Sequence, residues 1–334
     1  VRAWRGLPRD GGGRAGVEAA RLGAAEHTPE WDRAGVRYHY DAGNDFYRLF
    51  LDRRMVYSCG YFPTGAEGLD EGQERKLEHV CRKLRLRPGE RLLDIGCGWG
   101  ALAVHAATRH GARVVGVTLS EQQAELARLR VAEAGVEDRV RIELRDYREL
   151  RGERFDRVSS VGMFEHVGRK RLPEYFATVF SLLRPGGLFL NHGIGGRPRR
   201  PAPLVRGLLR RGLDRVLLDN GHFRRSYVFP NGDLVPVSEA DLVAERAGFE
   251  VRDVENLREH YGRTLRFWAE RLEARREDAR RLGGERVFRI WRLFMGIASW
   301  QFATGELAVY QSLLERPTGG PSEAVPWSRA DLYA

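Results

Sequence analysis

A glycine-rich turn between an apolar run and an amphipathic stretch constrains the fold of this chain more than any other feature. Residues 93–100 read LDIGCGWG. Three alternating glycines at the end of a strand are rarely needed for turning alone, and they let the backbone approach a ligand closely. We therefore expect a ligand-binding loop where the first strand of a sheet turns into the first helix.

Apolar runs and helical stretches alternate on the carboxyl side of this loop. The pattern predicts strands over 91–97, 113–119, 140–144, 155–161 and 188–193, and helices over 101–110, 121–134 and 171–183, the last ended by a turn at 184–187. Strands alternating with helices at this spacing are typical of a parallel sheet with helices on both faces. We expect an α/β fold with a doubly wound, mostly parallel sheet.

The remaining segments are assigned around this core. Residues 1–35 are predicted to be a flexible tail, because glycines and arginines occur there without apolar periodicity. Residues 36–90 are predicted to form a helical cap, interrupted at 61–65. The core is assigned to 91–316, with a helix over 238–247 capped by Ser238, a strand over 249–254, a long helical stretch over 263–302 and a last strand over 305–314. Residues 317–334 are assigned to a C-terminal tail.

The segment 197–225 breaks the alternation of strands and helices. Three prolines are followed by apolar residues at helical spacing among arginines. One interpretation is a basic amphipathic insertion that acts as a membrane-facing lid. The other is an ordinary surface helix with a solvated charged face, weakened by its two glycines. The sequence leaves both open.

The net charge of +10 bears on partners more than on the fold. A basic excess fits attraction to an anionic partner, either nucleic acid or the surface of a phospholipid membrane, and it also fits a solvated, arginine-rich surface. A nucleic-acid-binding protein is disfavoured, because the arginines are dispersed and no recognised binding motif accompanies them. No segment approaches the ~18 apolar residues needed to span a bilayer, so contact with an anionic membrane is expected to be peripheral.

Cysteine usage points to a reducing compartment. Cys59, Cys81 and Cys97 do not form a disulfide framework, and they lack the paired spacing of a zinc site. We therefore expect a cytoplasmic protein without a metal site, located in the cytoplasm or at the inner face of the membrane.

Two ligands compete for the glycine loop. Gly96, Gly98 and Ala101 meet the dinucleotide pattern G-x-G-x-x-G/A. That pattern expects an acidic residue near the end of the second strand to bind the ribose, and residues 116–120, GVTLS, contain none. A loop in which Asp94 precedes three alternating glycines instead resembles the first motif of class I methyltransferases, which bind S-adenosylmethionine. The choice between the two rests on the other motifs.

Six further segments resemble the cyclopropane-fatty-acid synthase family, which includes the mycolic acid cyclopropane synthases and methyltransferases. They are 39–47 (HYDAGNDFY), 57–62 (YSCGYF), 117–123 (VTLSEQQ), 162–168 (GMFEHVG), 192–195 (HGIG) and 229–232 (FPNG). They occur in the family's order, and the resemblance covers about residues 36–316. It implies a Rossmann-like class I methyltransferase fold in which the helical cap contributes to the active site.

The resemblance also implies a set of cofactor-binding residues. The methionine end of S-adenosylmethionine is expected near Tyr57 and Ser58, and the ribose near Thr118 and its neighbours. The adenine is expected near Asp146 and Tyr147. The set is Tyr57, Ser58, Asp94, Gly96, Gly98, Thr118, Leu119, Gln123, Asp146 and Tyr147. An acid at position 146 is suited to accept a hydrogen bond from the exocyclic amine of adenine.

The chemistry that the resemblance implies is methyl transfer to the double bond of an unsaturated fatty acyl chain. Attack by an alkene leaves a carbocation, and ring closure then needs a base, which this family is understood to hold as bound bicarbonate. The implied catalytic residues are Cys59, Glu165, His192, Tyr261 and the backbone at Ile194. Histidine and tyrosine can donate to an anion, whereas Glu165 beside an anion requires a proton on one partner.

Alternatives stay open at this point. Each catalytic candidate taken alone has an ordinary structural role, such as a small buried cysteine. The product is either a cyclopropane or a methyl or methylene branch, and a small-molecule methyltransferase on the same scaffold is a further candidate. The aromatic residues of 268–302 line an acyl tunnel or, for most of them, simply pack in the core. The lipid head group of the substrate is left open. The oligomeric state is left open as well, and a homodimer is one of the possible states.

Overall fold

The computed structural model describes residues 43–196, 233–321 and 326–333, together with Trp31 and Gly35. The insertion 197–225, the segment 229–232 and the first part of the segment 39–47 lie outside the described residues. The predictions made for these segments, and for most of the tail 1–35, therefore stay predictions.

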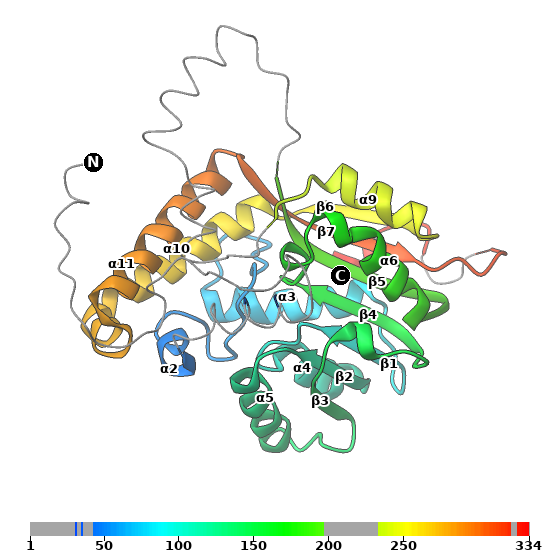
Figure 1. The fold of residues 1–334 in the computed structure, drawn as a ribbon, viewed down its shortest axis with the longest axis horizontal. Helices are drawn as coiled ribbons and strands as arrows, with labels where there is room; N and C mark the ends of the chain where they lie inside the picture. The colour runs from blue at the N-terminus through cyan, green and yellow to red at the C-terminus, as the bar shows by residue number, and fades with distance from the viewer. Residues whose placement is uncertain (1–30, 32–34, 36–42, 197–232, 322–325, 334) are drawn as a thin grey trace, which may run out of the picture.

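Seven strands form one mixed sheet in the order β3-β2-β1-β4-β5-β7-β6 (Figure 1). The strands are β1 (Arg91–Ile95), β2 (Arg113–Thr118), β3 (Val140–Leu144), β4 (Phe155–Val161), β5 (Leu183–Gly196), β6 (Glu250–Asn256) and β7 (Leu307–Glu315). The first five pair in parallel, whereas β7 runs antiparallel to β5 and β6. The expected doubly wound, mostly parallel sheet is confirmed. Its strand order reverses between β1 and β4, where ligands bind in open α/β sheets.

Helices cover both faces of the sheet because alternate strand residues point to opposite sides. Leu92 packs with α3 (Leu69–Lys83), α4 (Ala101–His110) and α5 (Glu121–Glu133) on one face. Leu93 packs on the other face, with α6 (Leu172–Leu182) and α9 (Val237–Arg246). Both leucines are fully buried, so the strand is covered on both sides.

A third layer lies beside the carboxyl ends of the parallel strands. It consists of α2 (Gly43–Arg48), the loop that follows it, α10 (Arg258–Ala274) and α11 (Arg276–Ala303) (Figure 1). Its interior is aromatic: the ring of Tyr47 lies 5.4 Å from that of Trp291, and the ring of Tyr57 lies 5.2 Å from that of Trp268. This cluster ties the N-terminal segment to the C-terminal helices.

The prediction of a helical cap over 36–90 is wrong for residues 49–68, which are not helical. Side chains bond the backbone of this loop in place of a helical ladder. The Asp52 carboxylate accepts hydrogen bonds from the N–H groups of Arg54 and Val56, and the Gln73 amide donates to the carbonyl of Ser58. In addition α3 packs on the sheet beside α4, so it belongs to a helical layer of the core.

Three further boundaries differ from the prediction. Helix α9 starts at Val237 with Pro236 at its N-cap, and Ser238 does not cap it. The long helical stretch is two helices, α10 and α11, separated at Arg275. The turn at 184–187 lies inside β5, where the pairing with β4 skips from Leu183 to Leu188 as a bulge.

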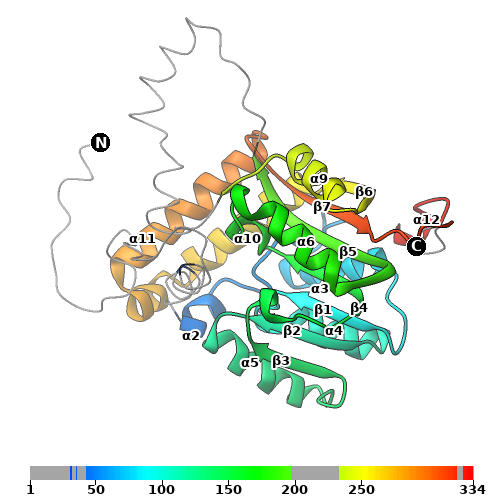
Figure 2. The same ribbon diagram turned by 45° about the vertical axis from the view of Figure 1, so that its right-hand side comes forward.

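The last residues are docked onto the core, whereas the sequence predicted only a tail. The short helix α12 (Ala330–Tyr333) lies near α3 (Figure 2). Asp331 pairs with Arg85 at 3.3 Å, and Arg329 pairs with Asp253 at 2.6 Å. The same Asp253 faces the fully buried Lys83 of α3, so these contacts join the C-terminal segment, β6 and α3.

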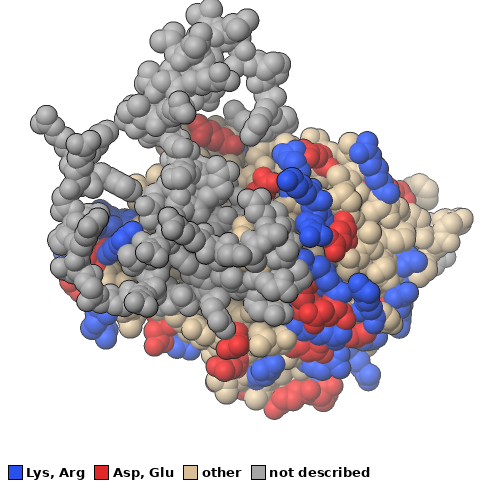
Figure 3. Space-filling model, in the orientation of Figure 1, with Lys and Arg blue, Asp and Glu red and all other residues tan. Residues whose placement is uncertain are grey.

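Charged side chains of both signs are interspersed over the uncovered part of the face in Figure 3. Many of them form surface ion pairs such as Arg171 with Glu174 and Arg75 with Glu71. No helix among the described residues has both the length and the apolar character that a membrane span requires.

We predict that Lys83→Met destabilises the fold strongly. The Lys83 Nζ lies 2.6 Å from Glu255 and 3.2 Å from Asp253, and the lysine is fully buried. Its removal takes the buried cation from two carboxylates, which keep Arg329 and His79 as partners, so we expect a cost near the lower end of the range of about 3–5 kcal/mol for breaking a buried pair. Urea unfolding measures the change, with Lys170→Met at an exposed position as the matched control. An unfolding free energy equal to that of the control would refute the structural role of this pair.

Candidate active site

The glycine loop turns directly from β1 into α4, as the sequence predicts. Gly96 and Gly98 have φ values of 75° and 55°, in the left-handed region that side chains other than glycine rarely adopt. A Cβ on Gly96 would also come within 3.0 Å of Met163, whereas a Cβ on Gly98 would project into open space. Gly96 therefore serves close packing, and Gly98 keeps space free beside the loop.

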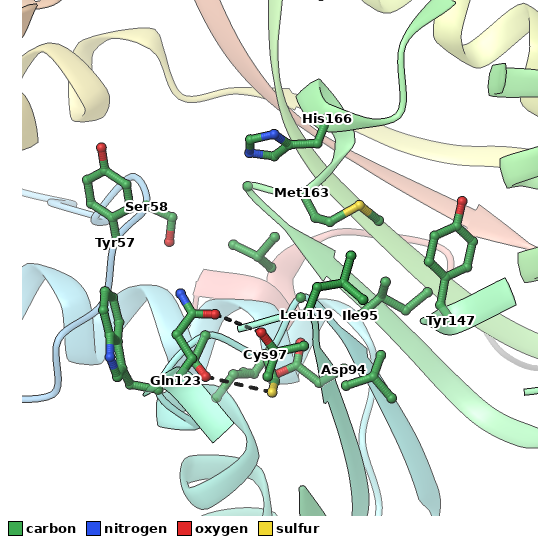
Figure 4. Close-up of a pocket in the computed structure, with 18 of the residues that line it drawn as sticks. Tyr57, Ser58, Asp94, Ile95, Cys97, Leu119, Gln123, Tyr147, Met163 and His166 are labelled. Carbon is green, nitrogen blue, oxygen red and sulfur yellow. Dashed lines mark hydrogen bonds between the residues drawn. The ribbon is translucent and has the colours of Figure 1, made fainter. Parts of the chain in front are cut away.

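A cavity lies over this loop at the carboxyl ends of β1, β2 and β4. All ten residues predicted to bind the cofactor line it: Tyr57, Ser58, Asp94, Gly96, Gly98, Thr118, Leu119, Gln123, Asp146 and Tyr147. Figure 4 shows Tyr57 and Ser58 on one side of the open centre and Tyr147 on the other. The structure thus brings the ten residues together, and their individual contacts with a cofactor stay predictions.

The polar side chains of this cavity are held by neighbours. The Thr118 hydroxyl donates to the Gln123 side chain at 2.7 Å. Asp94 is buried and accepts a hydrogen bond of 2.9 Å from Ser159, and burial raises the pKa of its carboxyl to about 6. Asp146 pairs with Arg148 at 2.6 Å, so its carboxylate is already engaged by a guanidinium.

Lys76 also lines this cavity, and the sequence analysis missed it. It is 2% exposed, and its Nζ donates to the Ser58 hydroxyl at 3.1 Å. Burial lowers the pKa of this ammonium to about 8. The sequence did contain a signal for Lys76. Residues 73, 76, 77 and 80 follow the i, i+3, i+4, i+7 spacing of a buried helix face, and two of them, Gln73 and Lys76, are polar where apolar residues are expected.

A second, largely apolar cavity adjoins the first. The two share Tyr57, Gly162 and His166, so they meet at these residues. Aliphatic and aromatic side chains supply most of the second lining: Ile194, Leu234, Leu265, Phe294, Ala298, Phe302 and Leu307. Of the aromatic residues predicted for a tunnel or the core, only Phe294 and Phe302 line this cavity, whereas Trp268, Phe288 and Trp291 are buried in the third layer and Trp300 is 46% exposed.

Three of the five predicted catalytic residues, Glu165, Ile194 and Tyr261, line this second cavity. Glu165 is 7% exposed, and its Oε1 accepts the backbone N–H of Ile194 at 2.7 Å. The short helical turn Phe164–His166 can lie this close to β5 because of Gly193, where a Cβ would come within 2.8 Å of the Phe164 ring.

His192 and Cys59 are buried and do not line either cavity. The Gln311 amide nitrogen lies 3.1 Å from His192 Nδ1; with this assignment of the amide, the neutral ring carries its proton on Nε2. Burial lowers the pKa of His192 to about 3, and Nε2 has no hydrogen-bond partner in the described part of the chain. The Cys59 thiol donates to the carbonyls of Gly60 and Leu257, and burial raises its pKa.

Comparison with known proteins agrees with this architecture. The sequence profile of the family described as mycolic acid cyclopropane synthetase matches residues 27–312. A "Probable fatty acid methyltransferase" of Pseudomonas putida is 42% identical over 308 residues, which are 92% of this chain and 75% of that one. The cyclopropane-fatty-acyl-phospholipid synthase of Escherichia coli K12 is 37% identical over 83% of this chain and 66% of its own length.

A solved structure agrees as well. The mycolic acid cyclopropane synthase CmaA1, in a crystal structure described as a complex with SAH and CTAB, superposes with a TM-score of 0.78 and 33% identity, covering 85% of this chain and 98% of that one. The matched family profile spans every residue that lines the two cavities described above. The chain therefore belongs to the mycolic acid cyclopropane synthetase family and is an S-adenosylmethionine-dependent methyltransferase.

Proposed function

We propose that this protein transfers a methyl group from S-adenosylmethionine to the double bond of an unsaturated fatty acyl chain of a phospholipid and closes a cyclopropane ring. The observation that carries the proposal is the junction of the two cavities at Tyr57, Gly162 and His166. A glycine-lined polar cavity suits the cofactor, and an apolar cavity beside it suits a hydrocarbon chain. Their junction is where a methyl donor and an alkene would meet.

The residues of the first cavity fit S-adenosylmethionine, which when bound supplies an electrophilic methyl group. Ser58 would bind the methionine carboxylate, because its hydroxyl is held by the Lys76 ammonium and that cation favours an anion nearby. Gly98 leaves room for close backbone approach, and the Thr118–Gln123 pair would face the ribose. These assignments combine the family resemblance with the lining of the cavity.

The second cavity supports an apolar acceptor that develops positive charge. Phe294, Phe302 and Tyr57 line it, and aromatic faces stabilise a nearby cation. Leu265 and Leu307 contribute further apolar surface, which excludes water and strengthens electrostatic interactions inside. A dry pocket of this kind protects a carbocation from capture by solvent.

Two donors fit the bicarbonate that the family resemblance implies: Tyr261 in the second cavity, and His192, which lines neither cavity but whose carbonyl accepts the N–H of Gly162 at the junction. The buried Nε2 of His192 lacks a hydrogen-bond partner within the described residues, and Tyr261 lines the cavity with a hydroxyl-bearing side chain. The Ile194 N–H is already bonded to Glu165, so Glu165 would orient this part of β5 and share a proton with the anion. Bicarbonate, when bound, would supply the base that removes the proton for ring closure.

A branched product is the second candidate. The relatives include proteins named as fatty acid methyltransferases as well as a cyclopropane synthase, and the same cavities suit both reactions. A small amine acceptor is less well supported, because the second cavity is lined mainly by aliphatic and aromatic side chains. Peripheral contact with an anionic membrane, a cytoplasmic location and a homodimer remain proposals from the sequence.

Expression in a bacterium lacking its own synthase tests the proposed reaction. With labelled methionine, mass spectrometry of total fatty acids should show one labelled carbon, loss of the double bond and a ring. A Gly96→Val variant, which would clash at Met163 and block the cofactor loop, serves as the inactive control. A labelled open-chain branch would show that the enzyme makes a branched product and does not close a ring. Absence of labelled lipid from folded protein that binds S-adenosylmethionine would refute the lipid substrate.

We predict that Lys76→Met weakens S-adenosylmethionine binding about 10-fold or more, the effect of losing a charge-assisted hydrogen bond to the group that holds the ligand. Because the ammonium has a pKa of about 8, wild-type affinity should fall as the pH rises through 8, whereas the variant's should not. Calorimetric titration at pH 7 and 9 measures both effects, with Lys170→Met as the matched control. Equal affinities for wild type and Lys76→Met would exclude this role.

We predict that Glu165→Gln lowers the rate of product formation about 100-fold or more, in the range for loss of a group that moves a proton. Binding of S-adenosylmethionine should change little, since Glu165 lies in the second cavity and not in the first. Steady-state kinetics and a binding titration separate the two effects. Glu245→Gln, at an exposed position on α9, is the control, and an active Glu165→Gln enzyme would contradict the assignment.

A further inference from the structure

A group of metal-ligand side chains lies outside both cavities, where α3 packs against α4. Cys81 of α3 meets His105 and His110 of α4, and one potential ligand atom from each lies within 4.8 Å of the other two. Cys81 is fully buried, His105 is 6% exposed, and the side chain of His110 is 18% exposed. The spacing of cysteines along the chain predicted no metal site, because the ligands come from two helices.

Glu78, three residues before Cys81 on α3, contacts both imidazoles. Its Oε2 lies 3.0 Å from Nε2 of His105 and 3.1 Å from Nε2 of His110. Its other oxygen accepts a hydrogen bond of 2.9 Å from Arg82, which fixes the orientation of the carboxylate. Carboxylates that bond to imidazoles in this way orient the histidines of metal sites.

We propose that Cys81, His105 and His110 bind one Zn²⁺ ion, with Glu78 as the carboxylate that completes or supports the site. Sulfur, imidazole and carboxylate donors together are a set that Zn²⁺ accepts in tetrahedral geometry. Zinc–ligand bond lengths imply ligand atoms about 3.3–3.6 Å apart, so the three groups, whose ligand atoms lie within 4.8 Å of one another, would draw closer together around the ion.

A hydrogen-bonded network without metal explains only part of this arrangement. It accounts for Glu78 between the two imidazoles, since Nε2 of each ring has this carboxylate as its partner. It makes no use of the Cys81 thiol, which packs in the hydrophobic core cluster and lies within 4.8 Å of both imidazoles. A metal ion would use all three groups, and the partly exposed His110 offers a path for its entry.

Zinc here would join the two helices that support the cofactor cavity. Helix α3 carries Gln73 and Lys76, which hold the Ser58 segment, and α4 begins immediately after Gly100 of the glycine loop. The ion would therefore be structural and would lie away from the reacting atoms. The inference does not depend on which lipid product the enzyme makes.

Titration of the full-length, tag-free protein tests the site. After treatment with a chelator and its removal, the protein is titrated with Zn²⁺ by calorimetry and with Co²⁺ by absorption spectroscopy. We expect one Zn²⁺ per chain, a thiolate-to-cobalt charge-transfer band and a higher melting temperature with zinc. Cys81→Ser should abolish the band and weaken zinc binding at least about 10-fold, and Glu78→Gln should weaken it about 10- to 100-fold.

Two variants keep the test decisive if Cys81→Ser does not fold. His110→Ala changes the most exposed ligand and should also weaken zinc binding while circular dichroism confirms the fold. Cys97→Ser removes a buried thiol elsewhere and should bind zinc as the wild type does. Absence of the thiolate band in the wild type, or zinc binding that survives both ligand variants, would overturn the proposal and assign any bound zinc to other histidines.

Discussion

The active site depends on how the loop between α2 and α3 is held. Asp52 closes a turn by accepting the N–H groups of Arg54 and Val56, and Gln73 and Lys76 then bond the backbone and the hydroxyl of Ser58. Each of these polar side chains is buried, so leaving it unbonded would cost free energy. The loop is therefore fixed, and this fixes Tyr57 at the junction of the two cavities.

The two cavities arise from different parts of the fold. The parallel strands β1, β2 and β4 supply the polar cavity, because their carboxyl ends meet at the point where the strand order reverses. The antiparallel pair β5–β7 and the helices α10 and α11 supply the apolar one. The polar cavity suits the cofactor and the apolar cavity suits the proposed acyl acceptor, and the two meet at one shared edge.

Buried polar groups near that edge are kept neutral or paired. Burial keeps His192 uncharged, so in the proposed reaction this ring would donate a hydrogen bond without adding positive charge. The two buried lysines of α3 differ in their partners: Lys83 faces two carboxylates and joins β6 to α3, whereas Lys76 faces a serine hydroxyl at the cofactor cavity. The first therefore serves the fold, and the second is free to influence a bound anion.

The sequence by itself determined the parallel sheet and the position of the glycine loop, because strand–helix alternation and Gly96 and Gly98 are local signals. The other residues predicted to bind the cofactor came from the resemblance to a family, and the structure places them all around one cavity. The sequence did not determine the path of residues 49–68, whose backbone is bonded by Asp52 of the loop itself and by side chains from α3 in place of a helical ladder. Nor did it bring Cys81 to the two histidines of α4. Contacts between distant segments depend on how helices pack on the sheet, and local periodicity carries no information about that packing; only the tertiary structure decided them.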